Sequence, residues 1–305
     1  MVQQDRAAGV LLGLACGDAL GRPVEGWSAT RIEREYGTLE TFVGGGVHDK
    51  PPGTVTDDTQ LAMVLARSLR YRGTFNRDDF VERLLDWYES QPFGIGGTTT
   101  EALRRISAGV PPTKAAERAR TTKPAGEKAT NGSVMRCAPL AVAYGDSREE
   151  LQKVSRASSK VTHADPRCVH GCAALNLTIA GFLTENVDPL ESALVDLSEE
   201  APVELLNGLG PIPDRVDSDE LRPVNDAVKT LRAAFYQALE ADYLEEAIVR
   251  AVNEGGDADT IGAVTGAVAG ARFGASELPE RWLSSLEHRT ELEQLARELC
   301  EFDPV

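Results

Sequence analysis

Two short acidic turns, far apart in the chain, contain the side chains best suited to chemistry. The first is Thr-Asp-Asp-Thr at residues 56–59, after a Pro-Gly pair, and the second is Asp-Ala-Asp-Thr at residues 257–260, after a Gly-Gly pair. Thr and Asp are good helix N-caps, and carboxylates suit the positive end of a helix dipole, so capping explains either turn taken singly. Two aspartates with flanking threonines nevertheless supply more oxygen atoms than one cap needs. Glycine and proline turns also let such side chains converge on one point.

If the two turns meet in space, four carboxylates lie within a few ångströms of one another. They cannot all stay ionised without a positive partner, and no Lys or Arg stands directly beside either turn in the sequence. Carboxylate and hydroxyl oxygens suit Mg²⁺, Mn²⁺ or Ca²⁺ rather than zinc. So many ligands favour two ions over one. The hypothesis is a binuclear site for divalent cations at two helix N-termini.

The composition of the 305-residue chain is that of a globular protein, with 42% apolar and 26% charged residues. Its formal charge of -16 disfavours general nucleic-acid binding and repels an anionic membrane surface. The acidic excess, with 7 Lys against 25 Arg, is similar to that of halophilic proteins, although an acidic mesophilic protein has the same composition. We expect a monomer.

Five cysteines, an odd number, form no disulfide framework in a chain of this length, which indicates a reducing, cytoplasmic compartment. Cys168 and Cys172 share one face of an expected helix, with His163 and His170 nearby as conceivable zinc ligands. Buried thiols are the preferred interpretation, because His170 points elsewhere on that helix.

No apolar run approaches the roughly 18 residues that a membrane helix needs. The apolar stretch at residues 7–19 could be mistaken for a signal sequence. Its charged start contains Asp5 as well as Arg6, and it continues into Gly-Asp-Ala-Leu-Gly at residues 17–21. We therefore expect a buried helix.

Helical periodicity dominates the chain and predicts an all-α fold with about ten or more helices. Residues 39–47 are the only strand-like piece. We expect a single domain over residues 1–305, with a proline-rich surface insertion at residues 198–223 and a solvent-facing helix near residues 287–300. A clean helical stripe is formed by Val224, Val228, Leu231, Phe235 and Leu239.

Glycines recur every four residues after the second acidic turn, at Gly262, Gly266, Gly270 and Gly274. The run also contains Asp259, so a membrane dimerisation motif is not the preferred interpretation. We expect a small-residue face that lets another helix pack closely against the metal site.

Six motifs, in order along residues 6–275, resemble the ADP-ribosylglycohydrolase family, which includes the enzyme that reactivates ADP-ribosylated dinitrogenase reductase. Each motif is weak alone, but their joint order is specific. They are Gly-Leu-Ala-Cys-Gly-Asp-Ala-Leu-Gly at 13–21 with Pro23 and Glu25, Thr-Asp-Asp-Thr at 56–59, Gly-Ile-Gly-Gly-Thr-Thr at 94–99, Asn-Gly-Ser-Val-Met-Arg at 131–136, Thr-His-Ala-Asp-Pro at 162–166, and Gly-Asp-Ala-Asp-Thr-Ile-Gly-Ala at 256–263.

The resemblance implies a compact multi-helix fold with two divalent cations, Mg²⁺ or Mn²⁺. It implies that Glu25 and Asp58 take part in catalysis, although Glu25 alone reads as a solvated turn residue. The metal ligands implied by the resemblance are Thr56, Asp57, Asp58, Asp257, Asp259 and Thr260.

ADP-ribose carries a pyrophosphate, which a net-acidic protein must neutralise locally. The glycine-rich motif precedes a helix expected to start near Thr100, whose free backbone N–H groups favour an anion. The motif at residues 131–136 is expected to open another helix. Both also read as ordinary turns with caps. Substrate-binding residues implied by the resemblance are Gly94, Gly96, Gly97, Asn131, Gly132, Ser133, Met135 and His163.

The chain departs from the family pattern at one place. Some relatives that act on ADP-ribosyl-arginine carry an aspartate where Gly94 stands, and often an asparagine where Gly97 stands. The departure puts arginine-linked substrates in doubt.

The resemblance implies a metal-dependent hydrolase that releases ADP-ribose from an ADP-ribosylated protein or small molecule by cleaving the bond at C1″ of the distal ribose. Arginine, serine, acetate, phosphate or another group is left open as the leaving group. Two alternatives stand beside it. One is a non-catalytic, crystallin-like ADP-ribose-binding relative, and the other is a binuclear-metal hydrolase of another nucleotide.

Overall fold

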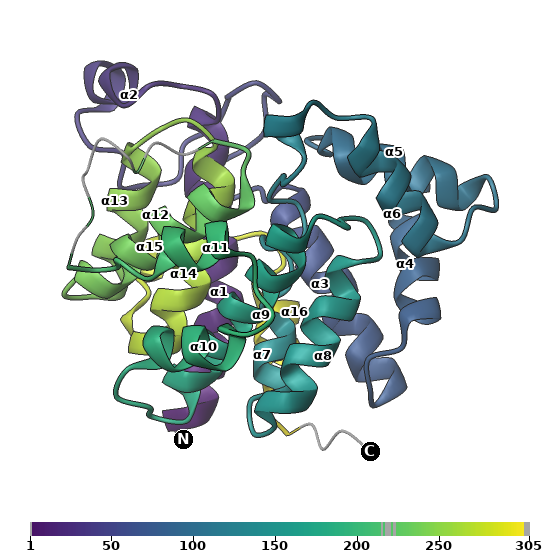
Figure 1. The fold of residues 1–305 in the computed structure, drawn as a ribbon. Helices are drawn as coiled ribbons and strands as arrows, with labels where there is room; N and C mark the ends of the chain where they lie inside the picture. Colours follow the sequence, from purple (N-terminus) through teal and green to yellow (C-terminus); the bar gives the residue numbers. More distant parts are fainter. Residues whose placement is uncertain (1, 215, 217–220, 222–223, 302–305) are drawn as a thin grey trace.

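The computed structural model describes residues 2–214, 216, 221 and 224–301, which form helices joined by loops, with no strand among them (Figure 1). This confirms the all-α prediction. The helices are α1 (Val2–Gly21), α2 (Ala29–Tyr36), α3 (Asp57–Arg72), α4 (Arg77–Glu89), α5 (Gly97–Ser107), α6 (Pro112–Thr121), α7 (Pro139–Tyr144), α8 (Arg148–Ser159), α9 (Pro166–Leu183), α10 (Pro189–Leu197), α11 (Val203–Leu209), α12 (Ala227–Glu240), α13 (Leu244–Asn253), α14 (Ala258–Phe273), α15 (Glu280–Leu283) and α16 (Arg289–Cys300), with 3-10 turns at η1 (Arg22–Val24), η2 (Ala125–Glu127) and η4 (Ala275–Glu277).

The strand-like piece at residues 39–47 is a loop, so that expectation was wrong. Gly45 and Gly46 have φ angles of 87° and 76°, which an extended strand does not accommodate. Within the described residues only an isolated bridge joins Gly45 to Lys50.

The centre of the fold is an antiparallel contact between α1 and α14, which lie side by side in Figure 1. Gly9 faces Gly270, and the next pairs along the two helices are Gly13 with Gly266 and Gly17 with Gly262. A Cβ added at any of these glycines would collide with the carbonyl oxygen of its partner. The expected small-residue face of α14 is thus confirmed. Its partner, α1, carries a matching stripe that the sequence analysis did not single out.

Residues Gln3–Val24, which include most of α1, are long and apolar enough by composition to cross a membrane. This differs from the expectation that no run approaches that length. However, 94% of the apolar window is buried inside the protein. The segment is a core helix, as expected for the stretch at residues 7–19.

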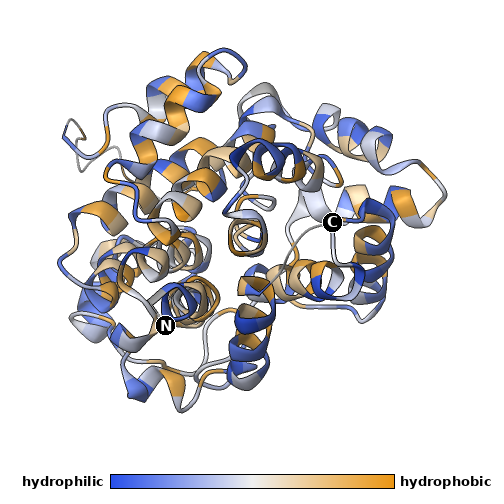
Figure 2. Ribbon diagram, turned by 90° about the horizontal axis from the view of Figure 1, so that it is seen from below, coloured by the Kyte–Doolittle hydropathy of each residue, from blue (hydrophilic) through white to orange (hydrophobic). Residues whose placement is uncertain are grey.

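The outer helices are amphipathic, and Figure 2 shows blue polar stretches on them beside orange apolar ones. Helix α16 packs on α1 and α3 through Leu292, Leu295 and Leu299, which are buried. The prediction of a solvent-facing helix there was wrong in this respect, because one complete face of α16 is apolar and covers the core.

Part of the expected surface insertion at residues 198–223 packs against the rest of the fold. Helix α11 packs on α9 and α12, with Leu205 and Leu209 buried. Residues 215, 217–220 and 222–223 lie outside the described residues. Helix α12 begins at Ala227 because Asp226 caps it, so Val224, the first residue of the predicted stripe, lies before the helix and is 42% exposed.

The cysteines carry no disulfide, and four of the five are buried. Cys168 Sγ donates to Thr130 O at 3.2 Å and Cys172 Sγ donates to Ser133 Oγ at 3.5 Å, so each thiol has a partner within the protein. The buried-thiol interpretation is confirmed for these two residues.

The backbone contact between α1 and α14 leads to a prediction on stability. Gly13→Ala should lower the free energy of unfolding by about 3 kcal/mol or more, because the new methyl group meets rigid backbone on α14. Gly126→Ala is the matched control, since a Cβ there meets nothing within 4 Å. Denaturant unfolding measures both variants, and equal stability of the two would contradict the contact.

Candidate active site

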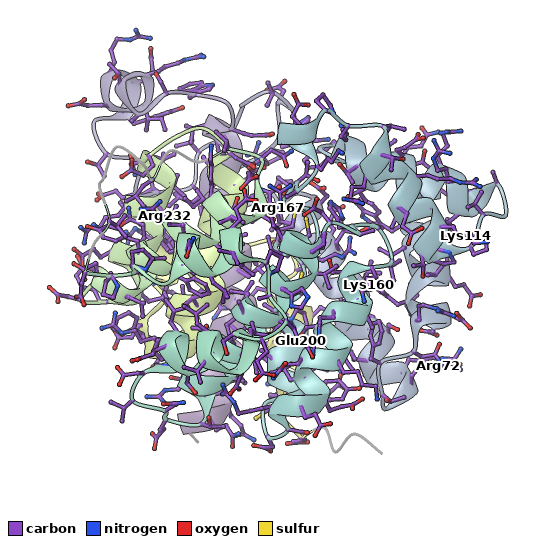
Figure 3. All side chains as sticks on the ribbon, in the orientation of Figure 1. Arg72, Lys114, Lys160, Arg167, Glu200 and Arg232 are labelled. Carbon is purple, nitrogen blue, oxygen red and sulfur yellow. The ribbon has the colours of Figure 1, made fainter. Side chains whose placement is uncertain are left out.

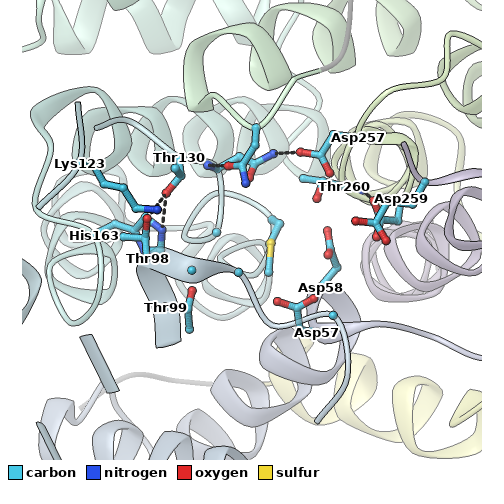
Figure 4. A pocket seen from close by; sticks show the side chains of 18 residues that line it. Asp57, Asp58, Thr98, Thr99, Lys123, Thr130, His163, Asp257, Asp259 and Thr260 are labelled. Carbon is cyan, nitrogen blue, oxygen red and sulfur yellow. Dashed lines mark hydrogen bonds between the residues drawn. The ribbon is translucent and has the colours of Figure 1, made fainter. Parts of the chain in front are cut away.

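The two acidic turns meet at one cavity of about 90 Å³. Asp57 and Asp58 come from the start of α3, and Asp259 and Thr260 from the start of α14, and Figure 4 shows them gathered on one side. The cavity is lined by Glu25, Asp57, Asp58, Gly94, Gly96, Gly97, Thr98, Thr99, Lys123, Thr130, Asn131, Gly132, Met135, His163, Asn225, Asp257, Asp259 and Thr260.

The first turn is held by hydrogen bonds that leave its aspartates largely uncommitted. The hydroxyl of Thr56, the N-cap of α3, accepts from the N–H of Asp58 at 3.3 Å and donates to Asp58 Oδ2 at 3.1 Å. The Thr56 and Thr59 N–H groups donate to the buried carboxylate of Asp18. Asp58 Oδ1 is buried and has no hydrogen-bond partner among the described residues. An orphaned carboxylate oxygen at a cavity wall fits a cation ligand.

The second turn is held from outside its own helix. Asp257 stands at the N-cap position of α14 but makes no cap bond, and its Oδ2 accepts from Asn131 Nδ2 at 2.7 Å. Asp259 Oδ1 accepts from the Thr260 N–H at 2.9 Å.

Glu25 belongs to a loop tied to this second turn. Gly26 N–H donates to Gly256 O at 2.6 Å, and Gly256 N–H donates to Trp27 O at 2.7 Å. Glu25 Oε2 lies 3.8 Å from His48 Nε2. The carboxylate therefore stands at the cavity edge beside the acidic turns.

Burial and mutual repulsion act together on the acidic side chains. Burial, followed by repulsion from Asp18, Asp57 and Asp257, raises the pKa of Asp58 well above its ordinary value. Burial and then repulsion from Asp58 and Asp257 do the same to the pKa of Asp259.

The pKa of Asp57 is also raised, by burial and then by Asp18, and that of Glu25 by burial and then by Asp257. The carboxylates of the two turns therefore repel one another across the cavity. In their chemistry, these carboxylate and threonine oxygens suit a hard divalent cation. As they stand, no three His, Cys, Asp or Glu side chains in the described part of the chain are arranged to hold one.

The opposite side of the cavity has a different chemistry. Lys123 is the only Lys or Arg among the described lining residues, and Figure 4 shows it beside Thr98 and His163, away from the aspartates. Helix α5 begins here at Gly97, three residues earlier than expected, and Gly96 gives it no side-chain cap. Free N–H groups and an ammonium on one wall favour an anion.

His163 is buried and neutral. Its Nδ1 lies 2.8 Å from Thr162 Oγ1 and its Nε2 lies 3.1 Å from Thr130 Oγ1. Burial and then repulsion from Arg136 lower the pKa of His163 to about 3. The imidazole is therefore suited to hydrogen bonding rather than to charge neutralisation.

Residues 131–136 form turns, and the next helix, α7, begins only at Pro139, so the expected helix at Asn131 was wrong. Asn131, Gly132 and Met135 nevertheless line the cavity. Ser133 is not among the lining residues. It is buried, and its hydroxyl accepts from Ser159 Oγ at 2.9 Å.

Several lining or supporting residues escaped the sequence analysis. Lys123 and Thr130 lie in a loop that the sequence marks only as polar, and Asn225 lies far along the chain. Asp18 offered a signal, because it is the one charged residue in α1 after Arg6 and belongs to one of the six motifs.

Comparison with known proteins places the whole chain beside one family. The family model described as ADP-ribosylglycohydrolase matches residues 1–304. An ADP-ribosyl-(dinitrogen reductase) glycohydrolase of Rhodospirillum rubrum is 32% identical over 95% of this chain and 92% of its own length. An ADP-ribosylarginine hydrolase of Serratia proteamaculans (strain 568) is also 32% identical, over 98% of this chain and 80% of its own. A solved structure titled ADP-ribosylglycohydrolase-related protein complex superposes with a TM-score of 0.83 at 34% identity, covering 98% of both chains.

The repulsion among the acidic turns leads to a prediction on pH and stability. A raised pKa in the folded state means that ionisation destabilises the fold as the pH rises above about 3.8, the ordinary value for Asp58. In chelator at pH 7–8, Asp58→Asn should therefore melt a few degrees above the wild type, and the gap should shrink near pH 4. Adding Mn²⁺ should reverse the order of the two proteins.

Asp79→Asn is the control of opposite sign. Asp79 is buried, which alone would raise its pKa, but hydrogen bonds from Arg83, Ser68 and Arg72 lower it. Its contribution to stability is present above its unfolded pKa and is lost as the pH falls through the folded one. This variant should melt below the wild type at neutral pH. An Asp58→Asn protein that also melts below the wild type in chelator would contradict the repulsive cluster.

Proposed function

The chain belongs to the ADP-ribosylglycohydrolase family, whose members hydrolyse glycosidic bonds to ADP-ribose, and we propose that it cleaves the bond at C1″ of the distal ribose with the help of two divalent cations. One observation carries the proposal. Turns some 200 residues apart in the sequence bring their carboxylates to one side of a cavity whose other side carries Lys123 and the start of α5. This polarity suits a molecule with a sugar at one end and a pyrophosphate further along.

The acidic side would hold the cations, Mg²⁺ or Mn²⁺. Bound there, such ions would hold the hydroxyls of the distal ribose and lower the pKa of a water. The residues proposed as ligands are Asp57, Asp58, Asp257, Asp259 and Thr260, which line the cavity, and Thr56, the N-cap of α3, which does not line it. Of these, Asp58 has the clearest claim, because its Oδ1 has no partner among the described residues.

The chain's own residues have separate tasks in the proposed reaction. The transition state resembles an oxocarbenium ion, which carboxylates such as Asp58 stabilise by their charge. Glu25 stands at the cavity edge, beside His48 and close to the second turn, where it can orient a water or protonate the leaving group. Asn131 keeps Asp257 in place through its amide hydrogen bond.

The opposite side would bind the phosphates. Gly97 and Thr98 offer first-turn N–H groups of α5, and Lys123 supplies the one positive side chain among the described lining residues. His163, neutral and bonded to Thr130, would complete this side with the 131–135 turn. Although the net charge of the chain is -16, these groups would provide a local positive region for the phosphates.

Gly94 bears on the leaving group. It has a φ of 80°, and a Cβ there would stand 3.2 Å from Asp57 Oδ1 and 3.8 Å from His48 Nε2. The cavity wall thus carries no carboxylate at this position that could pair with a guanidinium. We propose that an oxygen-linked leaving group is processed faster than arginine, even though the Serratia relative is named an ADP-ribosylarginine hydrolase.

A substrate panel tests the activity and the leaving group together. ADP-ribosyl-serine peptide, O-acetyl-ADP-ribose and ADP-ribosyl-arginine are incubated with Mg²⁺, with Mn²⁺ and with chelator, and free ADP-ribose is measured by mass. We expect release only with cation, and faster release from the oxygen-linked substrates. Asp57→Ala and Asp259→Ala should abolish release while circular dichroism stays that of the folded protein.

The two alternatives give different results in the same panel. A non-catalytic relative would bind ADP-ribose and release none from any substrate. A hydrolase of another nucleotide would be inhibited by simple nucleotides as strongly as by ADP-ribose. Full turnover in chelator would contradict the proposed role of the cations.

The proposed phosphate side is tested by Lys123→Gln. Losing one charge-assisted contact should raise KM roughly ten- to hundredfold with little change in kcat, because the contact is made equally in the ground and transition states. Lys114→Gln is the control, since Lys114 is exposed on α6 at the right-hand edge of Figure 3. Equal KM values for the two variants would exclude Lys123 from substrate binding.

A further inference from the structure

Two buried charged residues at the end of α1 make contacts that neither capping nor ion pairing accounts for. Asp18 lies in the last turn of α1 and Arg22 follows in η1, and both are 0% exposed. Each directs its polar atoms to the stretch of chain that leads into the first acidic turn.

Asp18 binds the start of α3 from a different helix. Its carboxylate accepts from Thr56 N–H at 2.9 and 3.1 Å, from Thr59 N–H at 3.1 Å and from Thr59 Oγ1 at 2.5 Å. The first N–H groups of a helix have no partners within that helix. Here Asp18 and the hydroxyl of Thr56 occupy them, so Asp58 is released from the capping that a first-turn aspartate ordinarily performs.

Arg22 binds the loop that precedes the turn. Its guanidinium donates only to backbone carbonyls in the described hydrogen bonds, with distances from 2.7 to 3.4 Å, and so it gathers residues 43–54 around one group. The carbonyls belong to Val43, Gly45, Lys50, Pro51 and Thr54.

The end of α1 also touches the second acidic turn. A Cβ on Gly21 would collide with the backbone of Ala258 and Asp259 at the start of α14. The same short segment therefore holds the start of α3 through Asp18 and the start of α14 through direct backbone contact. Because the glycine pairs prevent α1 from shifting on α14, the separation of the two turns depends on this segment.

We propose that Asp18 and Arg22 are positioning residues, which set the distance and orientation of Asp57 and Asp58 relative to Asp259 and so determine the affinity for the cations. This inference rests on the proposed function, in which those carboxylates are the ligands. Neither Asp18 nor Arg22 lines the cavity, so each acts through the turn.

The test compares Asp18→Asn with the wild type in two measurements. The first is a calorimetric titration with Mn²⁺ alone. The variant should bind Mn²⁺ roughly ten- to hundredfold more weakly, which is the usual effect of mutating a residue that supports a metal ligand. The second is amide hydrogen exchange at Thr56 and Thr59 in metal-free protein, which should become faster in the variant because their acceptor is an amide that also carries donors.

Asp79→Asn is the matched control, because it removes a carboxylate that is buried and hydrogen-bonded to Ser68, Arg72 and Arg83 on another part of the fold. It should leave both the Mn²⁺ affinity and the exchange at Thr56 unchanged. Thr59→Val, which removes one donor to Asp18 and keeps the charge, should weaken Mn²⁺ binding by a smaller factor and decides the question if Asp18→Asn does not fold. Arg22→Lys should weaken it too, since an ammonium cannot reach so many carbonyls.

Mn²⁺ affinity within twofold of the wild type in folded Asp18→Asn, or in Thr59→Val if the former does not fold, would overturn the proposal. A wild type that binds no Mn²⁺ would instead contradict the metal part of the proposed function. In that case, unchanged hydrogen exchange at Thr56 and Thr59 in Asp18→Asn still overturns the positioning role of Asp18. Faster exchange supports Asp18 as the residue that orders the turn.

Discussion

The approach of α1 to α14 at backbone distance is the constraint on which the rest of the structure depends. Glycines at four-residue spacing on both helices leave no side chain at the paired positions, so the two backbones meet at Gly9 with Gly270, Gly13 with Gly266 and Gly17 with Gly262. Such a contact has little freedom, because sliding one helix by a residue would place a Cβ against a carbonyl. The end of α1 is thereby held against the start of α14, and the loop after η1 and the start of α3 take their places around it.

The site built at this junction is electrostatically unfavourable without cations. Burial raises the pKa of Asp57, Asp58 and Asp259, and repulsion from neighbouring carboxylates raises each pKa further. A fold optimised for stability alone would replace them with apolar groups. Their retention beside a cavity, with Asp58 Oδ1 unpartnered among the described residues, indicates a binding role rather than a structural one. The neutral, buried His163 and the single Lys123 provide the contrast at the other side of the cavity.

Membership of the family bears on the reaction class, whereas the local departure from the family pattern at Gly94 bears on the leaving group. Coverage of residues 1–304 by the family model establishes the reaction class. In the proposed function, the leaving group depends on a few side chains at the cavity edge, where this chain has Gly94 with His48 nearby. Gly94 has a positive φ angle, which most residues with a side chain adopt only with strain. The glycine therefore goes with a particular loop conformation, and its difference from an aspartate is more than the loss of a carboxylate.

Helix periodicity, caps and acidic turns are local features, so the sequence alone predicted the helical class, the helices that begin at the two acidic turns, and the residue types around the proposed cation site. It also showed the stripe of glycines on α14, but not that α1 would fill it. Local patterns failed where neighbours decide the outcome. Helix α16 covers the core with its apolar face, the turn at Asn131 is not helical, and Ser133 lies beneath the cavity wall rather than on it. The folded chain alone brings Asp18, Lys123 and Asn225 to the site, because contacts between segments that are distant in the sequence depend on which helices pack together, and no local pattern records that pairing.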